Sequence, residues 1–106
     1  MPVELPAADT ERETALLPMW HVILWDDDDH TYTYVQAMMI ELFGHSSETA
    51  WKIAVEVDTS GRAVVDTTHR ERAEFKAEQI HAYGDDPWMS SGRKRAPMNA
   101  TIEPAP

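Results

Sequence analysis

The chain of 106 residues has no cysteine, and its nine lysine and arginine residues face nineteen aspartate and glutamate residues. Without thiols there can be no disulfide bonds, thiolate metal sites or thiol chemistry, which fits a reducing compartment. The formal net charge of −10 repels phosphate backbones, so we do not expect nucleic acid as a partner. The same charge attracts partners that carry a positive charge or an amine.

Long apolar runs are also missing. No stretch approaches the roughly 20 residues of a membrane-spanning helix. The N-terminus has no basic region followed by the apolar segment of a signal peptide. We therefore expect a soluble, cytoplasmic protein with no membrane partner. Proline, alanine and acidic residues dominate residues 1–19, which predicts a flexible extension before one domain over residues 20–104.

Three short segments have the character of strands. They cover residues 20–26, 62–66 and 98–103, where apolar or β-branched residues cluster or alternate with polar ones. Residues 85–97 hold glycine, proline and the only basic cluster, which predicts a loop. Strands separated by helical segments favour an α+β fold, in which helices cover a small sheet.

Three segments have helical spacing of apolar residues. The first is predicted over residues 31–43. The second begins after a cap at Ser46 or Ser47. The third begins at a capping box over residues 68–71 and ends at Gly84.

Four consecutive aspartates, residues 26–29, stand between the apolar strand and the first helix. One acidic side chain at a helix N-terminus stabilises the helix by ~0.3–1 kcal/mol. Four adjacent carboxylates repel one another, which favours a cationic partner. That partner could be a metal ion, a basic side chain or the free amino group of another chain. The run by itself leaves a solvated helix cap and an ammonium site equally open.

A calcium loop does not fit this run. With Asp26 as position one, position six is Thr31 instead of glycine and position twelve is Ala37 instead of glutamate. The five histidines form no zinc-binding helical pair, and they are His21, His30, His45, His69 and His81. No pattern supplies a nucleophile, an oxyanion hole or a cofactor site. We therefore expect no enzyme activity, no metal and no cofactor, with a small metal-dependent enzyme as the weakest alternative.

The order of these segments resembles the ClpS adaptor family. The resemblance starts with an apolar strand, an acidic run and a helix opening, and it extends over about residues 20–104. Its parts are residues 22–25 (VILW), 26–29 (DDDD), 30–35 (HTYTYV), the turn 61–63 (GRA), the third helix and residues 97–105 (PMNATIEPA). It implies a three-stranded antiparallel sheet packed against three helices.

ClpS family members bind the N-terminal residue of a substrate, the N-degron, and deliver the substrate to a Clp AAA+ unfoldase. The resemblance implies that this chain is a monomeric adaptor, not an enzyme, whose partners are N-terminal peptides with a large hydrophobic first residue and a ClpA- or ClpC-type unfoldase. The implied amine contacts are Asp26, Asp27 and Asp58, and the implied unfoldase contacts are Glu71 and Lys76. The implied hydrophobic pocket consists of Leu24, Asp28, His30, Tyr32, Val35, Ala54, Val57 and Met98.

Five of these positions depart from the family pattern. Asp26 replaces an asparagine and Asp58 replaces a histidine, so both changes add negative charge beside the amine. His30 replaces a threonine, whereas Tyr32 and Ala54 replace methionines. These changes imply a reshaped pocket with a different preferred side chain. They also leave open a divergent member that regulates the unfoldase without presenting N-degrons.

Overall fold

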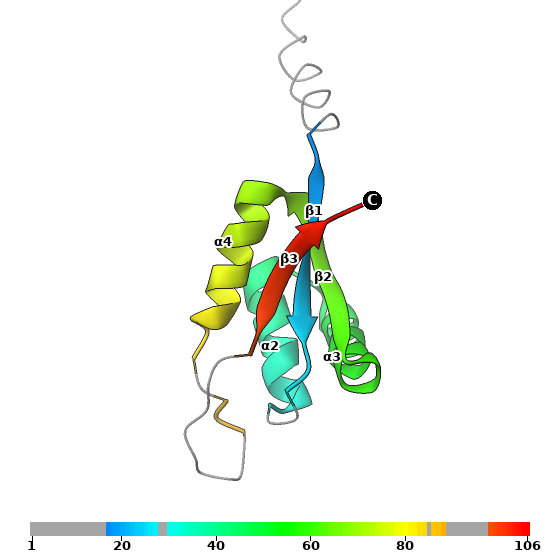
Figure 1. Ribbon diagram of the computed structural model, residues 1–106. Coiled ribbons are helices and arrows are strands. Elements are labelled where there is room, and N and C mark those ends of the chain that lie inside the picture. The colour runs from blue at the N-terminus through cyan, green and yellow to red at the C-terminus, as the bar shows by residue number, and fades with distance from the viewer. Residues whose placement is uncertain (1–16, 28–29, 85, 89–97) are drawn as a thin grey trace, which may run out of the picture.

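The sheet of this protein has three antiparallel strands in the order β2-β1-β3 (Figure 1). The central strand is β1 (Met19–Trp25), and its neighbours are β2 (Arg62–His69) and β3 (Ala100–Pro104). The computed structural model describes residues 17–27, 30–84, 86–88 and 98–106. The predicted α+β fold with a three-stranded antiparallel sheet is confirmed.

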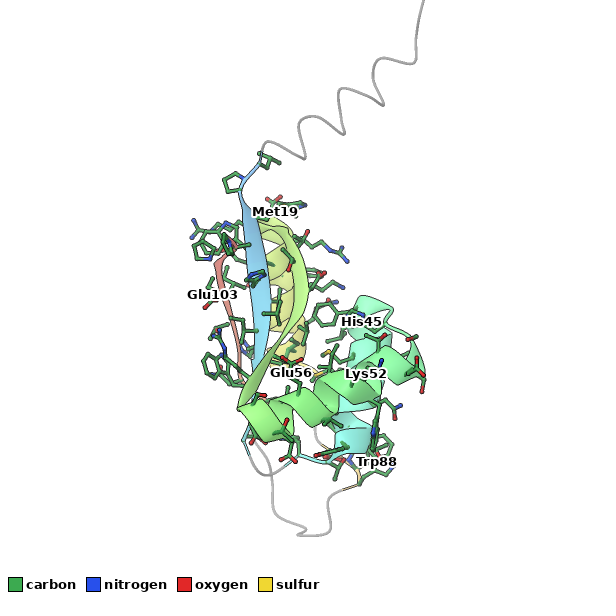
Figure 2. All side chains as sticks on the ribbon, turned by 90° about the vertical axis from the view of Figure 1, so that its right-hand side faces the viewer. Met19, His45, Lys52, Glu56, Trp88 and Glu103 are labelled. Carbon is green, nitrogen blue, oxygen red and sulfur yellow. The ribbon has the colours of Figure 1, made fainter. Side chains whose placement is uncertain are left out.

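Three helices cover one face of the sheet (Figure 2). They are α2 (Tyr32–Phe43), α3 (Ser47–Ser60) and α4 (Arg70–His81). Helix α4 packs on all three strands, whereas α2 packs mainly on α3. No helix among the described residues is long and apolar enough to cross a membrane.

The core lies between the sheet and the helices. Val22 and Leu24 of β1 alternate along the strand, point toward the helices and are fully buried. Met38 and Met39 of α2 meet them, and both are fully buried as well. Each such side chain contributes about 1.5–3 kcal/mol on burial. The apolar spacing that predicted these elements therefore forms one continuous core.

Local signals set the ends of α2 and α3. The Thr31 hydroxyl accepts the Tyr34 N–H at the start of α2. The Ser46 hydroxyl, rather than that of Ser47, caps α3. Gly44 ends α2 with φ of 71°, a left-handed conformation that favours glycine.

The predicted capping box at residues 68–71 is wrong. Strand β2 continues past residue 66, because β1 pairs with it as far as the Met19–His69 pair. Thr68 therefore belongs to the strand and cannot cap the helix. His69 caps α4 instead, where its Nδ1 accepts the Arg72 N–H at 3.4 Å.

Two other predicted ends shift by two or three residues. Helix α4 ends at His81 and not at Gly84, because the Ala82 N–H already closes the last turn on the Glu78 carbonyl. Strand β3 begins at Ala100 and not at residue 98. Most of the predicted 85–97 loop lies outside the described residues.

Candidate binding pocket at the end of the central strand

A pocket opens where β1 ends, between the start of α2 and the second half of α3. Its volume is about 110 Å³, and its lining residues are Asp26, His30, Tyr32, Val35, Ala54, Val57, Asp58 and Met98. An apolar cavity of about 150 Å³ holds a benzene molecule. The pocket therefore has the scale of one amino-acid side chain.

The inner wall of this pocket is apolar. Ala54 and Val57 lie one helical turn apart on α3, and Val35 faces them from α2. Met98 closes the wall from the segment before β3. All four side chains are at least 96% buried, with Val35 the most exposed at 4%.

Backbone hydrogen bonds fix the first carboxylate of the pocket. The Trp25 N–H donates to the Asn99 carbonyl at 3.0 Å, and the Asp26 N–H donates to the Gly61 carbonyl at 3.0 Å. The end of β1 is thus held from both sides. Asp26 occupies a defined place at the pocket because the strand ladder ends there.

Tyr32 and Asp58 are joined across the pocket. The Tyr32 hydroxyl donates a short hydrogen bond to Asp58 Oδ2. This bond raises the pKa of the Tyr32 phenol above its ordinary value, and burial and the charges of Asp58 and Asp26 raise it further. Both carboxylates are therefore close enough to act on the same group. A cation in this pocket would meet two negative charges.

An edge-on aromatic contact supports Tyr32. The ring of Trp51 on α3 lies 5.2 Å from the Tyr32 ring at an angle of 67°. Trp51 itself remains 43% exposed. No local signal in the sequence places this tryptophan beside the pocket.

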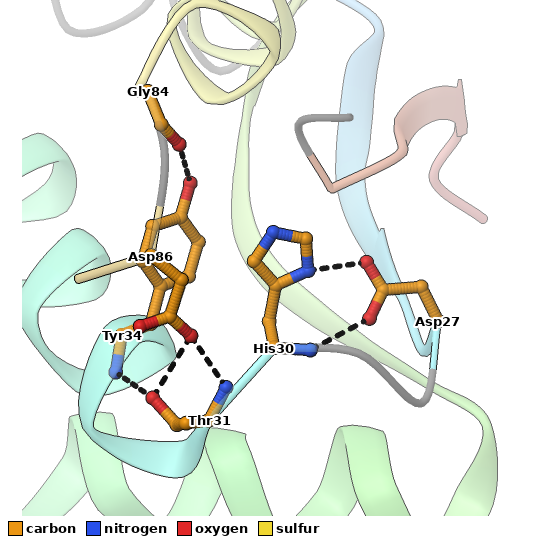
Figure 3. A network of polar contacts seen from close by, with 6 residues as sticks. All are labelled: Asp27, His30, Thr31, Tyr34, Gly84 and Asp86. Atoms are coloured by element: carbon orange, nitrogen blue, oxygen red, sulfur yellow. Dashed lines mark hydrogen bonds and ion pairs between the residues drawn. The ribbon is translucent and has the colours of Figure 1, made fainter. Parts of the chain in front are cut away.

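His30 is held by Asp27. Its Nδ1 lies 2.5 Å from Asp27 Oδ2, and its backbone N–H donates to Asp27 Oδ1 at 3.2 Å (Figure 3). A carboxylate only accepts hydrogen bonds, so Nδ1 carries a proton. The ring also packs on Tyr34, with the centroids 4.7 Å apart. The His30 side chain is 2% exposed.

A residue missed by sequence reasoning braces the start of α2. Asp86 Oδ2 accepts the Thr31 N–H at 2.7 Å and the Thr31 hydroxyl at 3.0 Å (Figure 3). Asp86 is 1% exposed. Beside it, the Tyr34 hydroxyl donates to the Gly84 carbonyl at 2.5 Å. Thr31 stands between His30 and Tyr32, so this network positions both pocket residues.

The sequence matches the family described as ATP-dependent Clp protease adaptor protein ClpS over residues 16–87. The chain belongs to the ClpS family. It is therefore an adaptor of the Clp protease system and not the protease itself.

Two curated ClpS relatives show the extent of the likeness. The ClpS adapter protein of Mycolicibacterium paratuberculosis is 34% identical over 87 residues, which cover 78% of this chain and 83% of the relative. The ClpS adapter protein of Mycobacterium marinum is 40% identical over 65 residues, which cover 61% of this chain and 64% of the relative. The family match over residues 16–87 includes β1, β2 and every lining residue of the pocket except Met98.

A solved structure of the ClpS family also matches. Agrobacterium tumefaciens ClpS2 bound to L-phenylalaninamide aligns with a TM-score of 0.70 and 26% identity. The alignment covers 83% of this chain and 98% of that chain. The fold described above is accordingly the ClpS fold.

Eight of the eleven residues expected at the ClpS-like site line the pocket. Leu24 does not line it, because it is fully buried in the core beneath β1. Asp27 does not line the pocket either, and its carboxylate is hydrogen-bonded to His30. Asp28 lies outside the described residues.

The two residues expected at the unfoldase surface differ in exposure. Glu71 is exposed in the first turn of α4. Lys76 is only 8% exposed, and its ammonium donates to the Leu42 carbonyl at the end of α2. The ammonium also lies 5.5 Å from the Phe43 ring centre. Lys76 thus joins α4 to α2, and the unfoldase contacts stay predictions.

The acidic run does not assemble a metal centre in the described part of the chain. Among those residues, no three His, Asp or Glu side chains gather in a way that could hold an ion. Two described aspartates form hydrogen bonds instead. Asp27 binds the His30 ring, and Asp58 accepts from the Tyr32 hydroxyl.

Proposed function

We propose that the pocket binds the first residue of a polypeptide whose α-amino group is free. The ammonium lies between the carboxylates of Asp26 and Asp58, and the first side chain enters the apolar cavity. One observation carries this proposal. Both carboxylates line the same small cavity as four buried apolar side chains.

Two modest contributions combine in such a site. An α-amino group has a pKa near 7.7–8.0 and is mostly cationic at pH 7. Hydrogen bonds to a charged group contribute about 1.5–3 kcal/mol, and burial of a Leu or Phe side chain contributes about 1.5–3 kcal/mol. An internal peptide bond offers no charge, and a polar first residue gains no burial. The pocket therefore selects residues that are both N-terminal and hydrophobic.

The ligand of the matching solved structure supports this chemistry. The L-phenylalaninamide bound to Agrobacterium tumefaciens ClpS2 has a free α-amine, an apolar side chain and an amide where a peptide would continue. We infer that this chain binds the same class of ligand. We also infer that it acts as a monomeric adaptor in the cytoplasm. It then delivers the substrate to a ClpA- or ClpC-type unfoldase through the α4 surface that carries Glu71.

The test is fluorescence anisotropy of peptides that carry a dye at the C-terminal end and differ only in the first residue. Free hydrophobic N-termini should bind, and acetylation should abolish binding because it removes the charge. Asp58→Asn should weaken binding about tenfold, since one charged hydrogen bond is lost. Glu56→Gln, an exposed change on the same helix, is the matched control. Equal binding of free and acetylated peptides would refute the proposal.

One observation favours a second function. In this structure Asp58 already accepts the Tyr32 hydroxyl, so one acceptor expected for the amine is engaged. A member of this kind could regulate the unfoldase without presenting N-degrons. The same panel separates the two functions. A chain that binds no peptide but still changes unfoldase ATPase activity would be the regulator.

A further inference from the structure

One wall of the pocket is supported from outside the cavity. Tyr32 lines the cavity, and the Trp51 ring contacts the Tyr32 ring without lining the cavity itself. We propose that Trp51 is a positioning residue that holds Tyr32 against the cavity. The cavity then accepts an aliphatic first side chain, leucine above all, in preference to the larger aromatic ones. This inference rests on the proposed function and names its substrate class.

Tyr32 is held at two points, and both lie on α3. Its hydroxyl donates to Asp58 Oδ2. Its ring meets the ring of Trp51 edge-on, with the centroids 5.2 Å apart and an angle of 67° between the planes. Tyr32 itself is the first residue of α2, so its side chain bridges the two helices at the pocket. The ring cannot turn away from the cavity without losing at least one of these contacts.

The other apolar walls leave little room for expansion. The four apolar side chains of the inner wall are at least 96% buried and belong to the core. Close-packed cores tolerate outward displacement poorly. Tyr32 is only partly buried, so its ring is the wall that a large first side chain would displace. The contact with Trp51 opposes that displacement.

The size of the cavity sets the limit. Its volume is about 110 Å³, whereas an apolar cavity of about 150 Å³ holds a benzene molecule. The isobutyl group of leucine is smaller than a benzene ring, and the benzyl group of phenylalanine is larger. With Tyr32 held in place, an aromatic first side chain overfills the cavity or stays partly outside it. Both arrangements weaken binding relative to leucine.

The experiment compares three amides by isothermal titration calorimetry on the full chain. They are L-leucinamide, L-phenylalaninamide and L-cyclohexylalaninamide, whose ring is as large as that of phenylalanine but is not aromatic. L-Leucinamide should bind about tenfold tighter than the other two. In Trp51→Ala the gap should shrink to about twofold or less, because the freed Tyr32 ring makes room for the larger groups. Trp51→Phe keeps an aromatic edge and should restore most of the gap. Phe75→Ala, which removes a 55% exposed ring from α4, is the matched control and should leave the gap unchanged.

The outcomes separate this inference from the proposed function. L-Phenylalaninamide or L-cyclohexylalaninamide binding as tightly as L-leucinamide would overturn the size limit while leaving the amine site intact. A gap that survives in Trp51→Ala would overturn the role of Trp51. Failure of all three amides would overturn both the inference and the proposed function. If circular dichroism shows that Trp51→Ala does not fold, Trp51→Leu, which keeps apolar bulk without a ring, decides the question in its place.

Discussion

Replacement of Lys76 by methionine tests the interpretation of this residue as a structural tie. The Leu42 carbonyl belongs to the last turn of α2, where the helix itself offers no donor to the final carbonyls. The Gly44 N–H donates to the backbone carbonyls of Met39 and Ile40. Lys76 of α4 supplies the donor for the Leu42 carbonyl. Its positive charge also stands at the negative end of the α2 dipole.

The expected magnitude follows from these contacts. A hydrogen bond from a charged donor contributes about 1.5–3 kcal/mol, and a cation at a helix C-terminus contributes about 0.3–1 kcal/mol. Methionine fills most of the space of the lysine stem, so only a small cavity remains. We expect Lys76→Met to lower the free energy of unfolding by about 2–3 kcal/mol, and Tm by roughly 8–20 °C.

Urea denaturation followed by tryptophan fluorescence measures this change. Lys52→Met, an exposed replacement on α3, is the matched control and should stay within about 0.5 kcal/mol of the unaltered protein. A loss below about 0.5 kcal/mol in Lys76→Met would refute the structural tie. Weaker delivery to the unfoldase with unchanged stability would instead favour Lys76 as a direct unfoldase contact.

Three other predictions concern the pocket and its supports. Ala54→Met should fill part of the cavity and weaken binding of the largest first side chains relative to leucine in the peptide panel; an unchanged order would show that α3 does not set specificity. Because the pKa values of Tyr32 and Tyr83 are raised in the folded protein, the unfolded phenols lose their protons first. Stability is then full below pH 10.0, the ordinary value, and decreases as pH rises above it. Tyr83→Phe should reduce the decrease of the urea midpoint with rising pH. An identical pH dependence would contradict the raised pKa of Tyr83. Asp86→Ala should destabilise the fold by about 1–3 kcal/mol and weaken peptide binding. Unchanged affinity would show that the hydrogen bonds from Thr31 to Asp86 are not needed to position the pocket.

The sequence predicted the elements that depend on local signals. Helix α2 follows from the spacing of its apolar residues within one short segment. The inner pocket wall also depends on local spacing, because Ala54 and Val57 share one face of α3. The family resemblance then brought the two segments together at one site.

Contacts between distant segments escaped sequence reasoning. Asp86 and Thr31 are 55 positions apart, and an aspartate before a proline indicates only a turn. Lys76 and Leu42 are 34 positions apart, so a buried partner for this lysine has no local sign. The end of β2 was missed for a related reason. His69 stays in the strand because its partner Met19 extends the ladder.

The position of β1 between two antiparallel neighbours has a mechanical consequence. Met19 and Arg62 lie at opposite ends of the β1–β2 ladder, whereas Trp20 pairs with Pro104 at the same end of the β1–β3 ladder. Force applied between the N-terminus and a site beside Arg62 slides the strands past each other and loads many hydrogen bonds together. Force between the two termini opens the β1–β3 ladder one bond at a time.

Optical-trap measurements can compare these two directions of load. The chain has no native cysteine, so Ser60→Cys places a unique attachment point two residues before the start of β2. We expect a higher unfolding force between the N-terminus and position 60 than between the two termini, and equal forces would contradict this reasoning. The same sheet would resist traction in one direction and unzip in the other.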